Sequence, residues 1–104
     1  MDTYLEKLIP IFEELRSSSM LISGNPHPTM QKYDLMFLGE KFNTIYTNDL
    51  HACLANYFGI KIEYSKLNEL VPSICNALSM KYEPMKEITD LNNPVPACYQ
   101  IELW

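Results

Sequence analysis

The sequence predicts an α+β fold that is mostly helical and ends in a C-terminal β-hairpin, within one domain spanning residues 1–104. Apolar residues recur at helical spacing over most of the chain and alternate with polar ones near its end. The alternating segments flank a loop dense in Pro, Asn and Asp, which is typical of a hairpin. A length of 104 residues fits a single domain.

The first helix is predicted at residues 3–16. Thr3 and Glu6 have the spacing of a capping box, and apolar residues follow at helical intervals. Pro10 removes one backbone hydrogen bond and crowds the carbonyl of Glu6. We therefore expect a kink or a late helix start at this proline.

The segment after this helix carries weaker signals. Residues 17–33 are rich in Ser, Gly and Pro, which predicts a long connection. Residues 34–46 are ambiguous, because Asp34 could cap a helix with one apolar face while Gly39 weakens that helix. We treat residues 1–46 as an N-terminal helical extension.

The clearest helix is predicted at residues 47–59. Thr47 or Asn48 can cap its start, and Gly59 suits a left-handed stop. Its apolar face consists of Leu50, Cys53, Leu54, Tyr57 and Phe58. The next residues, 60–64, alternate between apolar and charged side chains and predict a very short strand.

A second helical region follows, and Pro72 divides it. Ser65 can cap this region, and one apolar face continues through it. One interpretation is a single kinked helix over residues 66–80. The other is two helices that meet at a tight turn near Val71, with Pro72 at the first position of the second helix. The sequence favours two helices.

Residues 81–88 and 97–104 are the two predicted strands of the hairpin, and residues 89–96 form its loop. Pro84 confines the first strand to the edge of the sheet. In the second strand, side chains should alternate between the core and water. The residues expected to face the core are Tyr99, Ile101 and Leu103, and those expected to face water are Gln100 and Glu102.

The order helix, short strand, helix, turn, helix and hairpin over residues 47–104 resembles a winged helix-turn-helix. The resemblance implies that residues 72–80 are the recognition helix and residues 89–96 the tip of the wing. A DNA reader presents basic or amide side chains from this helix and further cations to the phosphates. The outward positions expected here are Ser73, Asn76, Ala77 and Met80, with Lys81 as the adjacent basic residue.

The charge balance opposes DNA binding by the chain alone. The whole chain carries a net charge of −5, and from residue 66 onward three lysines face five carboxylates. Few phosphate contacts can be built from that set. We therefore expect a protein-docking scaffold that contacts nucleic acid at most weakly or within a complex.

The sequence predicts neither an enzyme nor a cofactor or metal site. His27 and His51 have no Cys, Asp or Glu at ligand or triad spacing, which favours a surface role for each. No CxxC or CxxH pattern occurs, and Cys53 and Cys75 fall on apolar helix faces where a thiol packs as a small hydrophobe. The glycines form no phosphate-binding pattern.

The composition also bears on location. No run of apolar residues is long enough to cross a membrane, and the acidic start of the chain differs from a secretory signal. We expect a cytoplasmic protein.

Aromatic and methionine side chains are the best candidates for partner contacts. Seven Tyr, six Met and one Trp are many for this length, and these residues are favoured at interfaces. Trp104 can either close the bottom of the sheet or protrude as an anchor. The candidate partner-binding residues are Trp104, Tyr99, Met85, Asn76, Met80 and Lys81.

Two segments resemble a known family. YTNDLHACLANYFGIKIEYSKLNELV (residues 46–71) and ICNALSMKYEPMKEI (residues 74–88), together with the overall size, are similar to the small middle protein of the replication operon in staphylococcal cassette chromosomes. A member of that family binds an A-family DNA polymerase and lets it start primers de novo. The resemblance implies a polymerase-binding accessory factor of a mobile genetic element or phage, and no functional residue is carried over.

Two other function classes stay open. A phage- or element-encoded inhibitor, such as an anti-CRISPR or anti-host protein, would cluster carboxylates on one face to mimic nucleic acid. A winged-helix transcriptional regulator would dimerise and bind AT-rich DNA at low salt.

Overall fold

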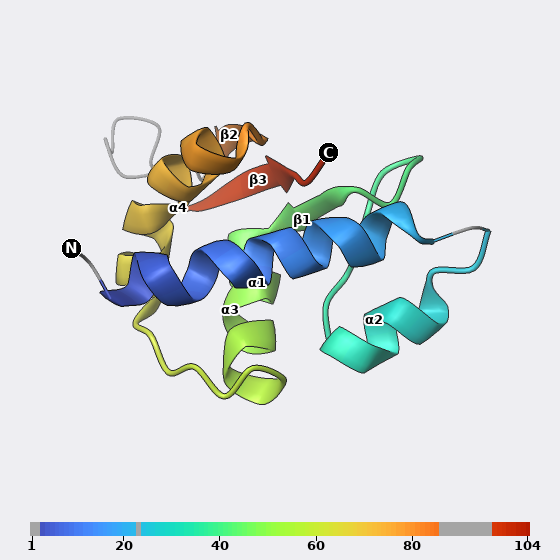
Figure 1. The fold of residues 1–104 in the computed structure, drawn as a ribbon, viewed down its shortest axis with the longest axis horizontal. Helices are drawn as coiled ribbons and strands as arrows, with labels where there is room; N and C mark the ends of the chain where they lie inside the picture. Colours follow the sequence, from blue (N-terminus) through green and yellow to red (C-terminus); the bar gives the residue numbers. More distant parts are fainter. Residues whose placement is uncertain (1–2, 23, 86–96) are drawn as a thin grey trace.

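The computed structural model describes residues 3–22, 24–85 and 97–104. Within these residues the chain forms four helices and a three-stranded antiparallel sheet, so the predicted α+β class is confirmed (Figure 1). The elements in chain order are α1 (Thr3–Met20), α2 (His27–Tyr33), β1 (Thr44–Tyr46), α3 (Thr47–Asn56), α4 (Tyr64–Leu78), β2 (Lys81–Met85) and β3 (Cys98–Glu102). No described helix is both long enough and apolar enough to cross a membrane.

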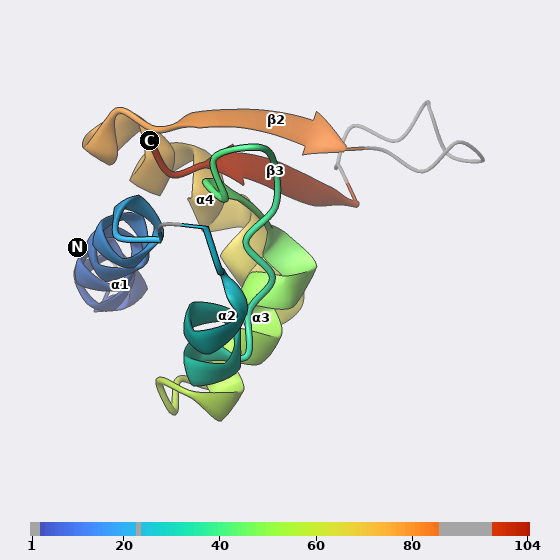
Figure 2. The ribbon, with the colours of Figure 1, turned by 90° about the vertical axis from the view of Figure 1, so that its right-hand side faces the viewer.

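The strand β3 lies in the middle of the sheet, whose order is β1-β3-β2. Ile101 is opposite both Ile45 of β1 and Tyr82 of β2, so these three side chains share one face. Figure 2 shows the sheet along one side of the molecule, with α1, α2 and α3 on the other side. Both α3 and α4 contact the strands.

One continuous core joins the helices to the sheet. Phe12 and Leu15 of α1, Leu54 of α3 and Ile74 of α4 are fully buried together with Ile101. Burial of each such side chain contributes about 1.5–3 kcal/mol relative to exposure. Helix α1 is therefore part of the same core as the sheet.

Helix α1 is four residues longer than the predicted segment 3–16 and runs through Pro10. Its buried side chains continue at helical spacing as far as Ser19. The buried face of the helix therefore extends into the three consecutive serines at 17–19, which the prediction left outside the helix. Pro10 lies on the exposed side, between the buried Leu8 and Phe12. Packing of the buried face of α1 stabilises the helix by more than the loss of one backbone hydrogen bond at Pro10 destabilises it.

The segment between α1 and α3 differs most from the prediction. Helix α2 replaces the expected long connection, with a proline at the favoured start of a helix. Asp34 ends α2 in a left-handed conformation (φ 53°) and does not cap a following helix. Of the two possibilities for residues 34–46, the helix does not form. Leu35 and Phe37 are buried on either side of the exposed Met36, which is the alternation of extended chain, and β1 follows.

Helix α3 confirms a helix that begins at Thr47, but it ends at Asn56 with Tyr57 as its cap. Gly59 has a left-handed backbone (φ 67°) but lies beyond the helix end and is not its stop. Thr47 is not its cap, however, because Tyr46 holds that position without a side-chain hydrogen bond. The strand expected at 60–64 is also wrong, since residues 60–63 belong to the connection between α3 and α4 and Tyr64 begins α4. Ile62 is buried there without strand pairing.

The preferred division near Val71 is wrong, because α4 is a single helix that contains Pro72. Its buried stripe runs without a break from Leu67 to Cys75. Ser79 then ends the helix in a left-handed conformation (φ 58°). The unbroken stripe favours one helix more strongly than the proline favours a turn.

Strands β2 and β3 pair antiparallel, as the predicted hairpin requires. β2 is an edge strand, where Pro84 is tolerated. Ile101 and Leu103 are fully buried and Tyr99 is half-buried, while Gln100 and Glu102 are partly exposed, as expected. The connection between the strands, including the predicted wing tip 89–96, lies outside the described residues.

Replacement of Phe12 tests whether α1 belongs to the core. Phe12→Ala should lower the free energy of unfolding by about 3–5 kcal/mol, because it leaves a cavity in the common core. Urea unfolding followed by circular dichroism measures this change. Lys7→Ala on the exposed side of α1 is the matched control and should shift stability by no more than about 0.5 kcal/mol. Equal stability of both variants would mean that α1 does not share the core.

Candidate partner-binding surface

The six predicted binding residues do not form one surface. Met80 is only 5% exposed, so the prediction that it faces outward is wrong. Because α4 ends at Leu78, Met80 lies in the turn into β2 and packs into the core. Tyr99 lies on the inner face of the sheet, where its ring meets that of Tyr82 edge to face at 5.8 Å.

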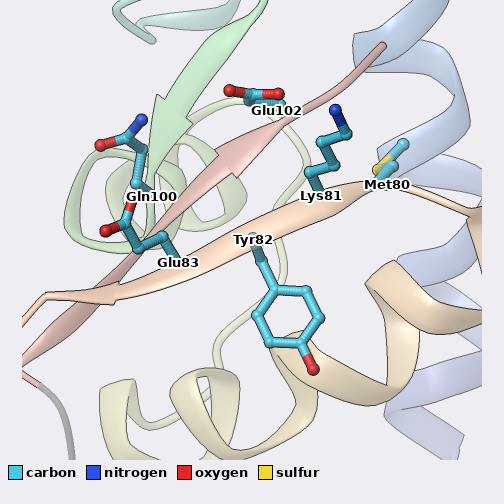
Figure 3. Close-up of a pocket in the computed structure, with 6 residues that line it drawn as sticks. All are labelled: Met80, Lys81, Tyr82, Glu83, Gln100 and Glu102. Carbon is cyan, nitrogen blue, oxygen red and sulfur yellow. The ribbon is translucent and has the colours of Figure 1, made fainter.

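Lys81 and Met85 project from the outer face of β2. Figure 3 shows Lys81 and Glu83 on the opposite side of the strand from Tyr82. Lys81, Glu83 and Glu102 of β3 are among the residues that line a shallow hollow of about 470 Å³. Lys81 lies opposite Glu102 in the strand register, so charges of both signs alternate there and favour no ligand of a single sign.

Asn76 lies on the exposed side of α4. The other exposed residues of this helix are Ser65, Glu69, Ser73 and Ala77. Lys66 is the only basic residue of α4, and it is half-buried. This face is therefore small, polar and weakly acidic.

Trp104 is held by hydrogen bonds although 41% of its surface is exposed. Its indole Nε1–H donates to Ser19 Oγ at 2.9 Å, and Ser19 Oγ–H donates to the carbonyl of Phe42 at 2.5 Å. Asn43 Nδ2 donates to the Trp104 carbonyl at 2.7 Å. The ring is thereby fixed before any partner arrives, which reduces the entropy that binding would cost.

Exposed apolar side chains also occur at the end of α1 and directly after it. Met20 and Leu21 follow Ser19 in the chain and are 57% and 82% exposed. The Lys41 amine lies 5.7 Å from the centroid of the Trp104 ring. We call Trp104 and Lys41 the Trp104 surface; Figures 1 and 2 both show the C-terminal residue close to α1.

A tight turn places Lys41 over this ring. Gly39 (φ 85°) begins the turn, and Phe42 also has a left-handed backbone (φ 52°), which is rare for a bulky residue. A bridge between Leu38 and Thr44 closes the turn. Such a backbone costs of the order of 1–3 kcal/mol and is found most often at functional sites.

The thiols and histidines give no support for catalysis. Burial raises the pKa of the Cys53 thiol and of the Cys75 thiol to about 12, so both stay protonated and unreactive at neutral pH. His51 Nε2 lies 2.7 Å from the carbonyl of Ile62, so this ring secures the connection between α3 and α4. Among the described residues, no cluster of His, Cys, Asp or Glu could hold a metal ion.

Sequence reasoning identified Trp104 but not the residues that fix it. Its indole is hydrogen-bonded to the end of α1 and its ring is still exposed, while its role as a partner anchor stays a prediction. Ser19 could have been found from its spacing of four residues after Leu15, which continues the buried side of α1. Lys41 and Phe42 gave no such signal, because their roles depend on a turn that local periodicity does not reveal.

Comparisons of the chain with protein-family models, with curated proteins and with solved structures found no match.

Removal of the Ser19 hydroxyl should free the indole. Ser19→Ala leaves the partly buried Phe42 carbonyl without its donor, so stability should fall by about 1–3 kcal/mol. The fluorescence anisotropy of the chain's single tryptophan should fall as well. Ser17→Ala, on the exposed side of the same helix, is the control and should change neither quantity. An unchanged anisotropy in Ser19→Ala would show that this hydrogen bond does not position Trp104.

The buried thiols predict a loss of stability in alkali. Between pH 9 and 12 the unfolded chain releases the Cys53 and Cys75 protons, whereas the folded chain retains them. Stability should therefore fall with rising pH, by at most about 1.4 kcal/mol per pH unit for each thiol. A Cys53→Ala/Cys75→Ala double variant, which keeps the tyrosines and lysines, should show a shallower fall in urea titrations. Equal slopes would contradict the assignment.

Proposed function

We propose that this protein is a non-catalytic accessory factor that binds another protein through a winged helix-turn-helix-like scaffold. Three features support this proposal: the order of the elements, the exposed face of α4 and the fixed ring of Trp104. The exposed face of α4 carries the most weight, because it separates protein docking from DNA reading.

The element order supports a winged-helix scaffold that begins earlier than residue 47. A helix, a strand, two helices and two strands occur in this order as α1, β1, α3, α4, β2 and β3, with the short helix α2 inserted between α1 and β1, and the last strand lies between the other two. In this proposal α1 and β1 take the positions that the sequence assigned to residues 47–64. The whole of α4, and not residues 72–80 alone, would be the recognition helix.

The exposed face of α4 is poorly suited to DNA. Glu69 is its only exposed charged residue, and it would face the phosphates of a duplex. Arg16, the only arginine, donates to the carbonyl of Leu78 at 3.0 Å and so secures the end of α4. With a net charge of −5, these features favour a protein surface as the partner of α4.

The resemblance of residues 46–71 and 74–88 to the cassette-chromosome middle protein supports a specific partner. These segments contain α3, most of α4 and β2. We propose an A-family DNA polymerase of a mobile element or phage replication module, which the protein would enable to start primers.

A DNA gel shift combined with affinity capture tests this function. The tagged protein should not shift an AT-rich duplex at 50 mM salt, and it should retain one polymerase in stoichiometric amount from cells that carry the element. The recovered polymerase should then make primers on an unprimed template only when the protein is added. A duplex shift at low salt without a retained protein would instead support the regulator.

A variant pair locates the contact on α4. Asn76→Arg should reduce capture at least about tenfold, because a bulky cation would occupy a small polar face. Ser17→Arg, on the exposed side of α1, is the matched control and should capture as much as the unmodified protein. Both variants should keep the thermal midpoint of unfolding. Equal capture by Asn76→Arg would exclude the α4 face.

A further inference from the structure

We propose that the Tyr64 hydroxyl is a positioning group that holds one end of the β2–β3 pair against the start of α4. We call this end, which consists of Met85, Ala97 and Cys98, the far end of the pair. This inference rests on the proposed function and adds a requirement to it. Binding of the partner at α4 requires that the far end stay in place beside the first turn of that helix.

Two successive hydrogen bonds join α4 to both strands at the far end. The Tyr64 hydroxyl donates to the Ala97 carbonyl at 2.6 Å, and the Ala97 N–H donates to the Met85 carbonyl at 2.8 Å. Tyr64 is the first residue of α4 and lies 33 residues before Ala97 in the chain. The contact is therefore a link between elements and not a local turn.

The lengths of α4 and β2 bring these groups level with each other. The helix has 15 residues and the strand has five, which correspond to about 22 Å and about 17 Å. At the opposite end the buried Met80 ties α4 to β2, since its N–H donates to the Cys75 carbonyl at 2.9 Å. With the Tyr64 bond, α4 is tied to the strands at both of its ends, which prevents a pivot about the turn at Met80.

The far end has little support from the rest of the sheet. The pairing of β1 with β3 begins at Gln100, so only two strands pair before that residue. Met85 and Ala97 are exposed, whereas Ile101 further along β3 is fully buried. A two-stranded ribbon with exposed side chains is marginally stable in water. A hydrogen bond from α4 therefore restricts motion more at the far end than at the centre of the sheet.

The Tyr64 side chain is well suited to act as a permanent donor. Burial raises the pKa of Tyr64, and the nearby Cys98 thiol raises it further, so the hydroxyl keeps its proton at neutral pH. The ring meets the His51 ring edge to face at 5.6 Å. His51 Nε2 in turn lies 2.7 Å from the Ile62 carbonyl, in the connection that leads to α4. The ring is thus held from one side while its hydroxyl reaches β3.

The far end affects partner binding because it lies where the exposed face of α4 begins. Ser65, the residue after Tyr64, is the first exposed residue of that face, and Ala97 is exposed as well. A partner that covers the first turn of α4 therefore also meets the far end. If the far end were released from Tyr64, the partner would have to order it on binding, which costs affinity.

Tyr64→Phe removes only the hydroxyl and tests this inference. Without a partner, amide hydrogen exchange followed by NMR should become at least about fivefold faster at Ala97, as expected for loss of one neutral hydrogen bond. The Tyr99 N–H, which donates to Thr47 Oγ1, should exchange at its original rate. Capture of the polymerase should fall about fivefold, while the thermal midpoint of unfolding falls by no more than about 8 °C.

Tyr46→Phe is the matched control, because it also removes a phenol hydroxyl that contacts β3. The Tyr46 hydroxyl lies 3.5 Å from Gln100 Oε1, and Figure 3 shows Gln100 on the side of the strands opposite to Tyr82. This variant should keep the exchange rate of Ala97 and the full capture of the polymerase.

Unchanged exchange at Ala97 or unchanged capture by Tyr64→Phe would overturn the inference, as would an equal loss of capture by Tyr46→Phe. If Asn76→Arg abolishes capture while Tyr64→Phe retains it, the proposed function stands and this inference fails. If the unmodified protein captures no polymerase, the proposed function fails and the inference fails with it.

Discussion

The fold depends on the central strand β3, which joins the two ends of the chain in one core. Ile101 is fully buried and lies opposite residues of both neighbouring strands. Thr47, the first residue of α3, accepts the Tyr99 N–H at 2.6 Å and donates to the Tyr99 carbonyl at 3.1 Å. This pair of hydrogen bonds fixes the start of α3 on β3, and β3 therefore sets the position of both the sheet and the helices.

The same strand also places the Trp104 surface. Leu103 is buried directly after β3, and its N–H donates to the carbonyl of Asn43 at 2.8 Å. Trp104 is thereby directed toward Ser19 at the end of α1. The left-handed backbone of Phe42 is tolerated because its carbonyl accepts a hydrogen bond from the Ser19 hydroxyl and because the bridge between Leu38 and Thr44 closes the turn that contains it. Core packing and the exposed anchor are thus parts of one arrangement.

The distribution of charged groups links this arrangement to the proposed function. Arg16 is committed to the end of α4, and the exposed face of that helix is almost neutral. The Lys41 amine, by contrast, lies 5.7 Å from the centroid of the exposed Trp104 ring. The exposed face of α4 is therefore almost neutral, and the exposed aromatic ring lies at a separate place; neither provides a strong phosphate-binding field.

The sequence by itself determined α3, the helical character of residues 64–78, the antiparallel pairing of β2 with β3 and the burial of Cys53 and Cys75, because helical and strand periodicities are local. Only the tertiary structure decided that α4 continues through Pro72, that Met80 is buried and that residues 44–46 form a strand. In those places a local backbone preference worth about 1–3 kcal/mol is smaller than the free energy gained when apolar side chains are buried in the common core. The Trp104 surface was decided in the same way, since Ser19 and Trp104 are 85 residues apart in the chain and meet only in the folded molecule.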